Sequence, residues 1–360
     1  MTKDAGSFSD TVAAPAKVRR DDKAMLRAAA DLTRDLNIPS ARIYWTDFLA
    51  SALVGYGALA LAATIDRPLI MLIAGLASIL ALFRAGSFIH ELTHIKKGEL
   101  KGFKLGWNLI VGIPLLIPSF LYEGIHNLHH AKIRYGTVED PEYLPLALMK
   151  PWTLPLFVVA AALAPIALLF RFALLAPLSM LIPPLRKLVV ERYSGLQINP
   201  LFRRKRAEGE LARQWRWQEA GASIWAIGLI AMAVTGVISL QAMLVFLAVT
   251  SGTMLLNQTR TLVAHLWEND GEPLSVTEQF LDSVNVPPPG PSAELWAPVG
   301  LRYHALHHLL PGLPYHALPT AHRRLKATLG DDSAYHGANY GGLFPLVGRL
   351  AINSWRGGRG

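Results

Sequence analysis

Long stretches without a charged residue constrain the fold of this chain more than any other feature. Residues 48–65 carry no charge over 18 positions, and residues 220–259 carry none over 40. A bilayer leaves no water for backbone groups, so about 20 apolar residues in a helix are the usual way to cross it. Only 17% of the residues are charged, against about 25% in average soluble domains. The sequence therefore predicts an all-α integral membrane protein.

We expect four transmembrane helices arranged as two hairpins. The first hairpin joins residues 48–65 to residues 68–89, and the second lies within residues 220–259 with a turn near 236–241. Arg84 is the one charge in the second predicted span. It lies close enough to the end of that span for its side chain to reach the interface.

Two further apolar segments, 105–122 and 151–185, are predicted to be re-entrant or interfacial helices. Prolines interrupt both, and prolines free backbone carbonyls that lipid cannot satisfy. Residues 96–104 are rich in lysine, and residues 186–216 hold nine Lys or Arg against three Glu. Such loops stay cytoplasmic, so an even number of crossings separates them. The alternative is that both segments cross, which gives six spans.

Nine of the twelve histidines form three clusters and one isolated position. Residues at i, i+3 and i+4 share one face of a helix, so each cluster presents its imidazoles in one direction. Neutral imidazole binds iron, zinc, copper or nickel. Nine such groups exceed what one four- to six-coordinate ion uses, which implies two metal ions. The residues are His90 and His94; His126, His129 and His130; His265; and His304, His307 and His308.

The clusters share a metal centre only if they lie on one side of the membrane. Residues 105–122 must then return to the side from which they enter, in agreement with their prolines. The predicted fold is thus two hairpins, re-entrant or interfacial helices, and a cytoplasmic helical cap that carries the histidines.

The three histidine clusters, in chain order the first, second and third boxes, follow a recognisable arrangement. One hairpin precedes the first box and another precedes the third, and this arrangement resembles that of the membrane fatty acid desaturase family. The resemblance covers roughly residues 40–325 and is strongest to bacterial acyl-lipid enzymes. It implies two non-haem irons at the cytoplasmic face, held by the eight clustered histidines. It also implies that O2 is used to oxidise a lipid acyl chain, with desaturation as the first interpretation.

Other positions are interpreted through the same resemblance. His265 is similar to an extra ligand that acyl-CoA desaturases carry after the fourth span, but Thr261 stands where those enzymes have an asparagine. Three residues separate His90 from His94, as in acyl-lipid and sphingolipid desaturases, which favours a substrate without coenzyme A. His316 belongs to a segment that resembles the one after the third box in bacterial desaturases. We interpret His316 as structural or as orienting a ligand.

Carboxylates near the boxes have two interpretations. Metal-bound histidines usually donate their second ring N–H to a carboxylate, carbonyl or water. For Glu268 and Asp270 we weigh this role equally against that of a solvated loop charge. We favour solvated loop charge for Glu123, Glu139, Asp140 and Glu142.

Three alternatives remain open. A hydroxylase is chemically close to a desaturase, because both reactions remove hydrogen from an unactivated methylene. Residues 90–94 also fit the HExxH motif of a zinc protease, with Glu91 as general base and Asp270 as the best third ligand. That reading leaves the other clusters unexplained. In a metal transporter, the ligands would line a membrane pathway instead.

We divide the chain into a cytoplasmic, partly disordered segment 1–40, a membrane desaturase domain 41–325 and a cytoplasmic tail 326–360. The chain has no cysteine and therefore no iron–sulfur cluster. Electrons are expected from a separate ferredoxin-, rubredoxin- or cytochrome-type protein. The net charge of +9 is explained by the basic loops, without a nucleic-acid motif. We expect an integral membrane protein, in the inner membrane if the source is bacterial.

Overall fold

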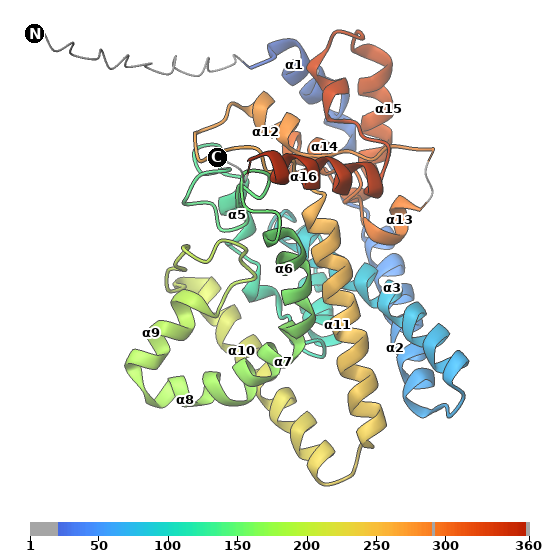
Figure 1. Ribbon diagram of the computed structural model, residues 1–360, viewed down its shortest axis with the longest axis vertical. Coiled ribbons are helices and arrows are strands. Elements are labelled where there is room, and N and C mark those ends of the chain that lie inside the picture. Colours follow the sequence, from blue (N-terminus) through green and yellow to red (C-terminus); the bar gives the residue numbers. More distant parts are fainter. Residues whose placement is uncertain (1–20, 290–291, 358–360) are drawn as a thin grey trace, which may run out of the picture.

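The computed structural model describes residues 21–289 and 292–357. This part of the chain is helical, without a strand, and has only isolated β-bridges. Figure 1 shows long helices below a cap of shorter helices, with the cap at the end where α3 and α11 finish. The predicted all-α fold is confirmed. The predicted disorder falls largely on residues 1–20, which lie outside the described residues.

Four long helices form the two expected hairpins. Pro68 stands in the first turn of α3, where its fixed φ suits a helix start and its missing N–H has no partner to lose. The helices are α2 (Ala41–Thr64), α3 (Pro68–Leu92), α10 (Gly209–Val234) and α11 (Leu240–Leu262).

Small residues let these helices approach closely, as is usual in membranes. A Cβ atom added at Gly55 of α2 would lie 2.6 Å from Leu82 Cδ2 of α3. A Cβ atom at Gly252 of α11 would lie 2.4 Å from a methyl group of Ile79, also on α3. Arg84 lies near the end of α3, and its side chain is partly exposed. Its guanidinium donates to both carboxylate oxygens of Asp47 on α2, at 2.7 and 2.6 Å, and so joins the two helices of the first hairpin.

Residues 103–121 enter the bundle and turn back, as predicted. They form α4 (Phe103–Trp107), the π-helix η2 (Asn108–Gly112) and the 3-10 turn η3 (Ser119–Leu121). Side chains from neighbouring helices satisfy carbonyls that this irregular backbone leaves free. Tyr56 donates to the Ile110 carbonyl at 2.7 Å, and the Trp225 indole donates to the Pro114 carbonyl at 3.0 Å.

Residues 153–181 form one long helical segment, although we expected a non-spanning structure here. It is built from short pieces joined end to end, and Pro165 and Pro177 stand in the first turns of two of them. With this segment, the described residues contain five helices long and apolar enough to cross a membrane. The pieces are α6 (Thr153–Val159), η4 (Ala160–Leu163), α7 (Ala164–Phe170), η5 (Arg171–Leu175) and α8 (Ala176–Leu181).

The path of this segment is bent. In Figure 1, α6 and α7 descend beside α11, α8 turns sideways, and α9 (Pro183–Arg192) leads back toward the cap. The chain therefore returns through α9, which carries the first of the basic residues 186–206.

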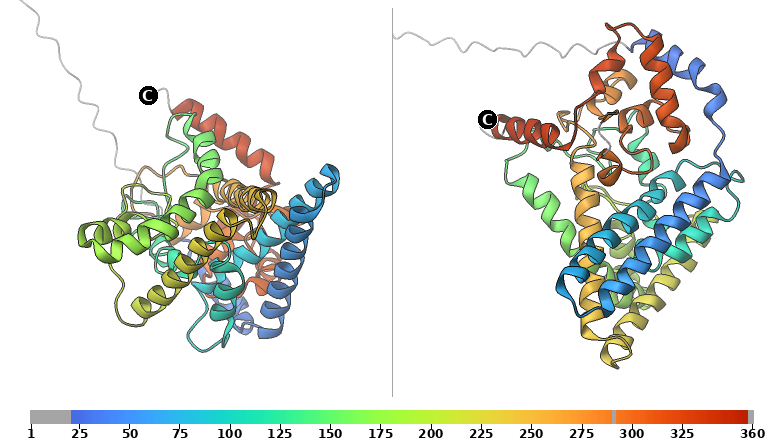
Figure 2. Two further views of the ribbon diagram at one scale, coloured as in Figure 1. Left: turned by 90° about the horizontal axis from the view of Figure 1, so that it is seen from below. Right: turned by 90° about the vertical axis from the view of Figure 1, so that its right-hand side faces the viewer.

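The cap is built from the N-terminal helix, the short helix α5 and the described residues after α11. α1 lies alongside α15, and Met25 and Ala29 are buried in the same core as Leu325 (Figure 2, right). α16 crosses the top of α11 and buries Leu346 and Leu350, so residues after 325 pack onto the domain. The cap helices are α1 (Lys23–Leu32), α5 (His126–His129), α12 (Val276–Asp282), α13 (Ala293–Trp296), α14 (His304–Leu309), α15 (Leu318–Thr328) and α16 (Leu343–Gly357). The described cap also contains the short 3-10 turns η1 (Arg34–Leu36), η6 (Tyr315–Ala317) and η7 (Ala334–Ala338).

Candidate metal centre

Four segments bring the nine predicted histidines to one place in the cap. His90 lies in the last turn of α3, and His94 follows the end of that helix. The Thr93 hydroxyl donates to the His90 carbonyl at 2.7 Å and closes the turn between them. The second box lies on α5 and on His130, the residue after that helix. The third box lies on α14, and His265 follows α11.

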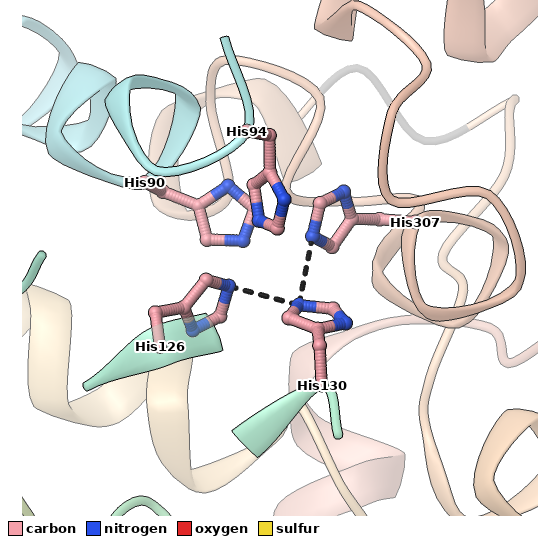
Figure 3. Close-up of side chains that lie close together, drawn as sticks. All are labelled: His90, His94, His126, His130 and His307. Atoms are coloured by element: carbon pink, nitrogen blue, oxygen red, sulfur yellow. Dashed lines mark hydrogen bonds between the residues drawn. The ribbon is translucent and has the colours of Figure 1, made fainter. Parts of the chain in front are cut away.

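The histidines form two groups, in each of which the candidate ligand nitrogens lie within 4.8 Å of one another. Figure 3 shows the five rings of the first group around a common point. The second and third boxes each contribute to both groups, so the groups are interleaved. The first group is His90, His94, His126, His130 and His307, and the second is His129, His265, His304 and His308.

The spacing of the ring nitrogens fits bound metal ions. The Nε2 atoms of His126 and His130 are 2.9 Å apart, and those of His130 and His307 are 3.1 Å apart. In the second group, Nε2 of His304 lies 3.0 Å from that of His265 and 3.2 Å from that of His308. With a metal–nitrogen bond of ~2.1 Å, ligands at right angles would be ~3.0 Å apart and tetrahedral ligands ~3.4 Å apart. The observed distances lie in the range expected of neighbouring ligands on one ion.

Several nitrogens of the first group have no other partner. Both ring nitrogens of His90 and Nε2 of His94 are buried without a hydrogen bond. Burial lowers the pKa of His94 to about 4, and burial together with neighbouring histidines lowers the pKa of His126 and His307. These imidazoles are therefore neutral at physiological pH. Neutral imidazole is the form that binds metal.

Carboxylates orient two histidines of the second box. Nδ1 of His129 donates to Asp140 at 2.9 Å, and neither side chain is exposed. Burial by itself lowers the pKa of His129, but Asp140 outweighs burial and raises it. Nδ1 of His126 lies 3.1 Å from Glu142, and burial raises the pKa of Glu142 to about 7. The Tyr122 hydroxyl donates to Glu142 at 2.9 Å.

The expectation of solvated loop charge was therefore wrong for Asp140 and Glu142. Both lie against histidines, because residues 131–142 fold back over α5. Glu139 is exposed, as expected, and Glu123 pairs with Lys104.

A second set of polar groups surrounds His265. Its Nδ1 lies 2.8 Å from the Tyr135 hydroxyl, which donates to Asp282 at 2.7 Å. Burial raises the pKa of Asp282 to about 6. Ser283 lies 3.2 Å from the same nitrogen. The sequence analysis did not identify these residues.

The residues predicted to support the ligands do not lie beside them. Glu268 accepts from Arg349 at 3.0 Å and Asn353 at 2.7 Å, because α16 covers this loop. Asp270 is exposed, and the Thr261 hydroxyl donates to the Asn257 carbonyl in its own helix. Of the two interpretations weighed for Glu268 and Asp270, the structure favours surface charge, and Thr261 bonds within its own helix. His316 accepts from the Ser40 backbone N–H at 3.1 Å, which is a structural role.

The geometry also disfavours the protease. Glu91 accepts from the Tyr44 hydroxyl and from the Tyr315 backbone N–H, so its carboxylate holds α2 and the third-box segment against α3. A general base must instead be free to take a proton from water. The proposed third zinc ligand, Asp270, belongs to neither histidine group.

Comparison with known proteins decides the family. Residues 67–340 match the family model described as fatty acid desaturase. The chain belongs to the fatty acid desaturase family. This membrane family accounts for the apolar helices and the oxidoreductase chemistry expected of the histidine groups. A ceramide hydroxylase from Caulobacter vibrioides is 50% identical to this desaturase-family chain over 329 residues, which are 91% of the chain and 93% of the relative. No solved structure matches the chain significantly.

Proposed function

We propose that this protein is a di-iron lipid hydroxylase that acts on ceramide or a similar N-acyl lipid. One observation carries the choice of reaction: the ceramide hydroxylase of C. vibrioides is similar along almost its whole length. Desaturation is the first interpretation of the sequence and hydroxylation the second, and this likeness favours hydroxylation. Desaturation remains the competing outcome of the experiment below.

The two histidine groups would hold one iron each. Iron with O2 supplies an oxidant strong enough for an unactivated C–H bond, which no side chain provides. The nine assigned ligands are the histidines of the two groups.

The protein itself prepares this site. Burial lowers the pKa of His94, His126 and His307 and so favours their neutral form. Asp140 and Glu142 would fix the orientation of His129 and His126. Holding ring orientation in this way is a common means of setting metal affinity.

Electrons would come from a separate donor protein, since the chain contains no cysteine for a cluster of its own. Lys205 and Arg206 are exposed, while Arg204 is buried and donates to the Glu123 carbonyl at 2.6 Å. Glu123 lies three residues before His126, so Arg204 joins this basic loop to the segment that carries the second box. Acidic ferredoxins are candidates for the donor, and the basic loops favour a cap on the cytoplasmic side.

The function can be tested in cells that make ceramide and express the chain with a ferredoxin and its reductase. Lipids are extracted and compared by mass spectrometry with those from cells expressing the H308A variant. We expect ceramide that has gained one oxygen atom, labelled when the cells grow under isotopically heavy O2. Ceramide that has instead lost two hydrogens would move the protein to the desaturases.

A further inference from the structure

The last described helix, α16, is held against the cap by one of its faces. Leu346, Leu350 and Ser354 of this face are buried. They recur every four residues, a spacing that keeps side chains on one side of a helix. Val347 packs into the same core as Leu346. This face accounts for only part of the apolar residues of α16.

The opposite face of α16 is also apolar, but it is exposed. Phe344 is 85% exposed, Ile352 52% and Trp355 58%. Ala351, Ile352 and Trp355 follow Phe344 after 7, 8 and 11 positions, so the four side chains form one exposed stripe along the helix. A helix that is apolar on both sides is normally covered on both sides. The exposed stripe therefore calls for a partner outside the described residues.

α16 lies at the level where two candidate membrane spans end. Leu350 shares a core with Leu262, the last residue of α11. The Ser354 hydroxyl donates to the Met149 carbonyl at 2.8 Å, just before α6 begins at Thr153. Both α11 and the segment that begins with α6 are long and apolar enough to cross a membrane. Since a helix with its side chains is about 10 Å wide, α16 stays within reach of the headgroup layer.

The direction of α16 suits a membrane surface. In Figure 1 and in the right view of Figure 2, α16 runs across the molecule, whereas α11 runs along it. The left view of Figure 2 looks from the end opposite the cap and shows α16 at the rim of the molecule, beyond α11. A bilayer around the long helices would therefore extend toward α16.

The charges of α16 suit the same surface. α16 contains Arg349 and Arg356 and no acidic residue, so it favours anionic headgroups. Arg349 donates to Glu268 of the cap at 3.0 Å. This bond fixes the rotation of the helix, so the exposed stripe faces neither the core of the cap nor the loop of Glu268. Large apolar residues on one side with arginines beside them are typical of helices that lie in a membrane interface.

We propose that α16 lies in the headgroup layer of the bilayer, with Phe344, Ile352 and Trp355 against the upper part of the acyl chains. The partner of the exposed stripe is thus the lipid surface around the spans. This contact does not depend on the reaction, because α16 contributes no residue to either histidine group. It anchors to the bilayer the part of the cap that covers the end of α11.

Single cysteines test the contact directly. The chain has no cysteine, so I352C carries one environment-sensitive fluorophore per chain. D332C is the control, because Asp332 is an exposed acidic residue outside α16. Each labelled full-length protein is placed in lipid nanodiscs at one copy per disc. The fluorescence is then quenched either by aqueous iodide or by a nitroxide near the carbonyl end of the lipid acyl chains.

The two labels should respond in opposite ways. We expect the label at residue 352 to be quenched by the lipid nitroxide and protected from iodide, and the label at residue 332 to show the reverse. Equal access of iodide to both labels would overturn the proposal. Protection at residue 352 that appears only in discs holding two copies would assign the exposed stripe to a contact between chains and would also overturn it.

Hydrogen exchange provides a test without a label. F344S/I352S makes the exposed stripe polar and leaves the buried face intact. We expect about tenfold faster backbone exchange of residues 343–357 in nanodiscs, the order expected from losing the lipid burial of two large apolar side chains. Exchange of α11 should stay unchanged. L201S is the control, because Leu201 is 67% exposed and lies far from α16 in the sequence. Wild-type exchange in F344S/I352S, or equal acceleration by L201S, would contradict the proposal.

Discussion

The carboxylate of Asp140 lies 2.9 Å from Nδ1 of His129, and both side chains are almost completely buried. Asp140 also accepts from the backbone N–H groups of Gly136 and Glu142, at 2.9 and 2.8 Å. One carboxylate therefore holds a loop closed and a candidate ligand in place.

Replacing Asp140 by alanine should weaken metal binding. Loss of the partner of a ligand histidine typically costs 10–100-fold in metal affinity or activity. We expect D140A to lose iron about 10–100-fold more readily to a chelator than the wild type, measured by titration. The control is E139Q, which changes the exposed neighbour and should behave as the wild type. Equal retention of iron by D140A and the wild type would contradict the assignment.

Histidines inside and outside the two groups should differ in their effect on iron content. H308A removes a member of the second group, and we expect a clear fall in iron per chain, measured by plasma mass spectrometry. H316A removes an imidazole that bonds to the Ser40 backbone, and we expect iron content to be unchanged. The ligand set would need revision if H316A lost as much iron as H308A.

Iron should stabilise the folded chain. A ligand that binds only the folded state adds about 2.7 kcal/mol at a free concentration 100 times its Kd. We expect the Tm of chelator-treated protein in detergent to rise when ferrous iron is added without oxygen. Magnesium is the control, because it prefers oxygen ligands and should leave the Tm unchanged. A Tm that iron leaves unchanged would argue against a shared metal centre.

The ion pair between Arg171 and Glu219 should contribute strongly to stability. Their side chains are 4% and 8% exposed and lie 2.6 Å apart, with Arg186 2.8 Å from the same carboxylate. Removing one partner of a buried pair leaves an uncompensated charge and costs about 3–5 kcal/mol. E219A should therefore lower the free energy of unfolding in detergent by about this amount. E210A, which breaks an exposed pair with Arg213, should have no measurable effect.

The histidine groups were predictable because their signal is local. Spacing of three and four residues aligns side chains on a helix whatever the rest of the fold does. The hairpins were predictable from the length and apolarity of their segments.

The partners of the histidines were not predictable in this way. Asp140 reaches His129 only because the chain after α5 folds back, and no periodicity marks such a loop. Glu268 is close in sequence to His265, yet its carboxylate accepts a hydrogen bond from Arg349 of α16 and does not contact that histidine. Tyr135 meets His265 across 130 residues of sequence.

The helical segment 153–181 shows that proline does not always end a helix. Pro165 and Pro177 each stand in the first turn of a new helical piece, where a missing N–H costs little. The intervening π-helical turn η5 absorbs the irregularity. Prolines at such positions segment a helix without ending it.

The interleaving of the two histidine groups has a consequence for assembly. His129 faces one group while His126 and His130, its neighbours on the same turn, face the other, and α14 divides its histidines in the same way. The distance between the two sites is thus determined by the pitch of two helices. Because each helix contributes to both groups, a displacement of either helix would disturb both groups at once.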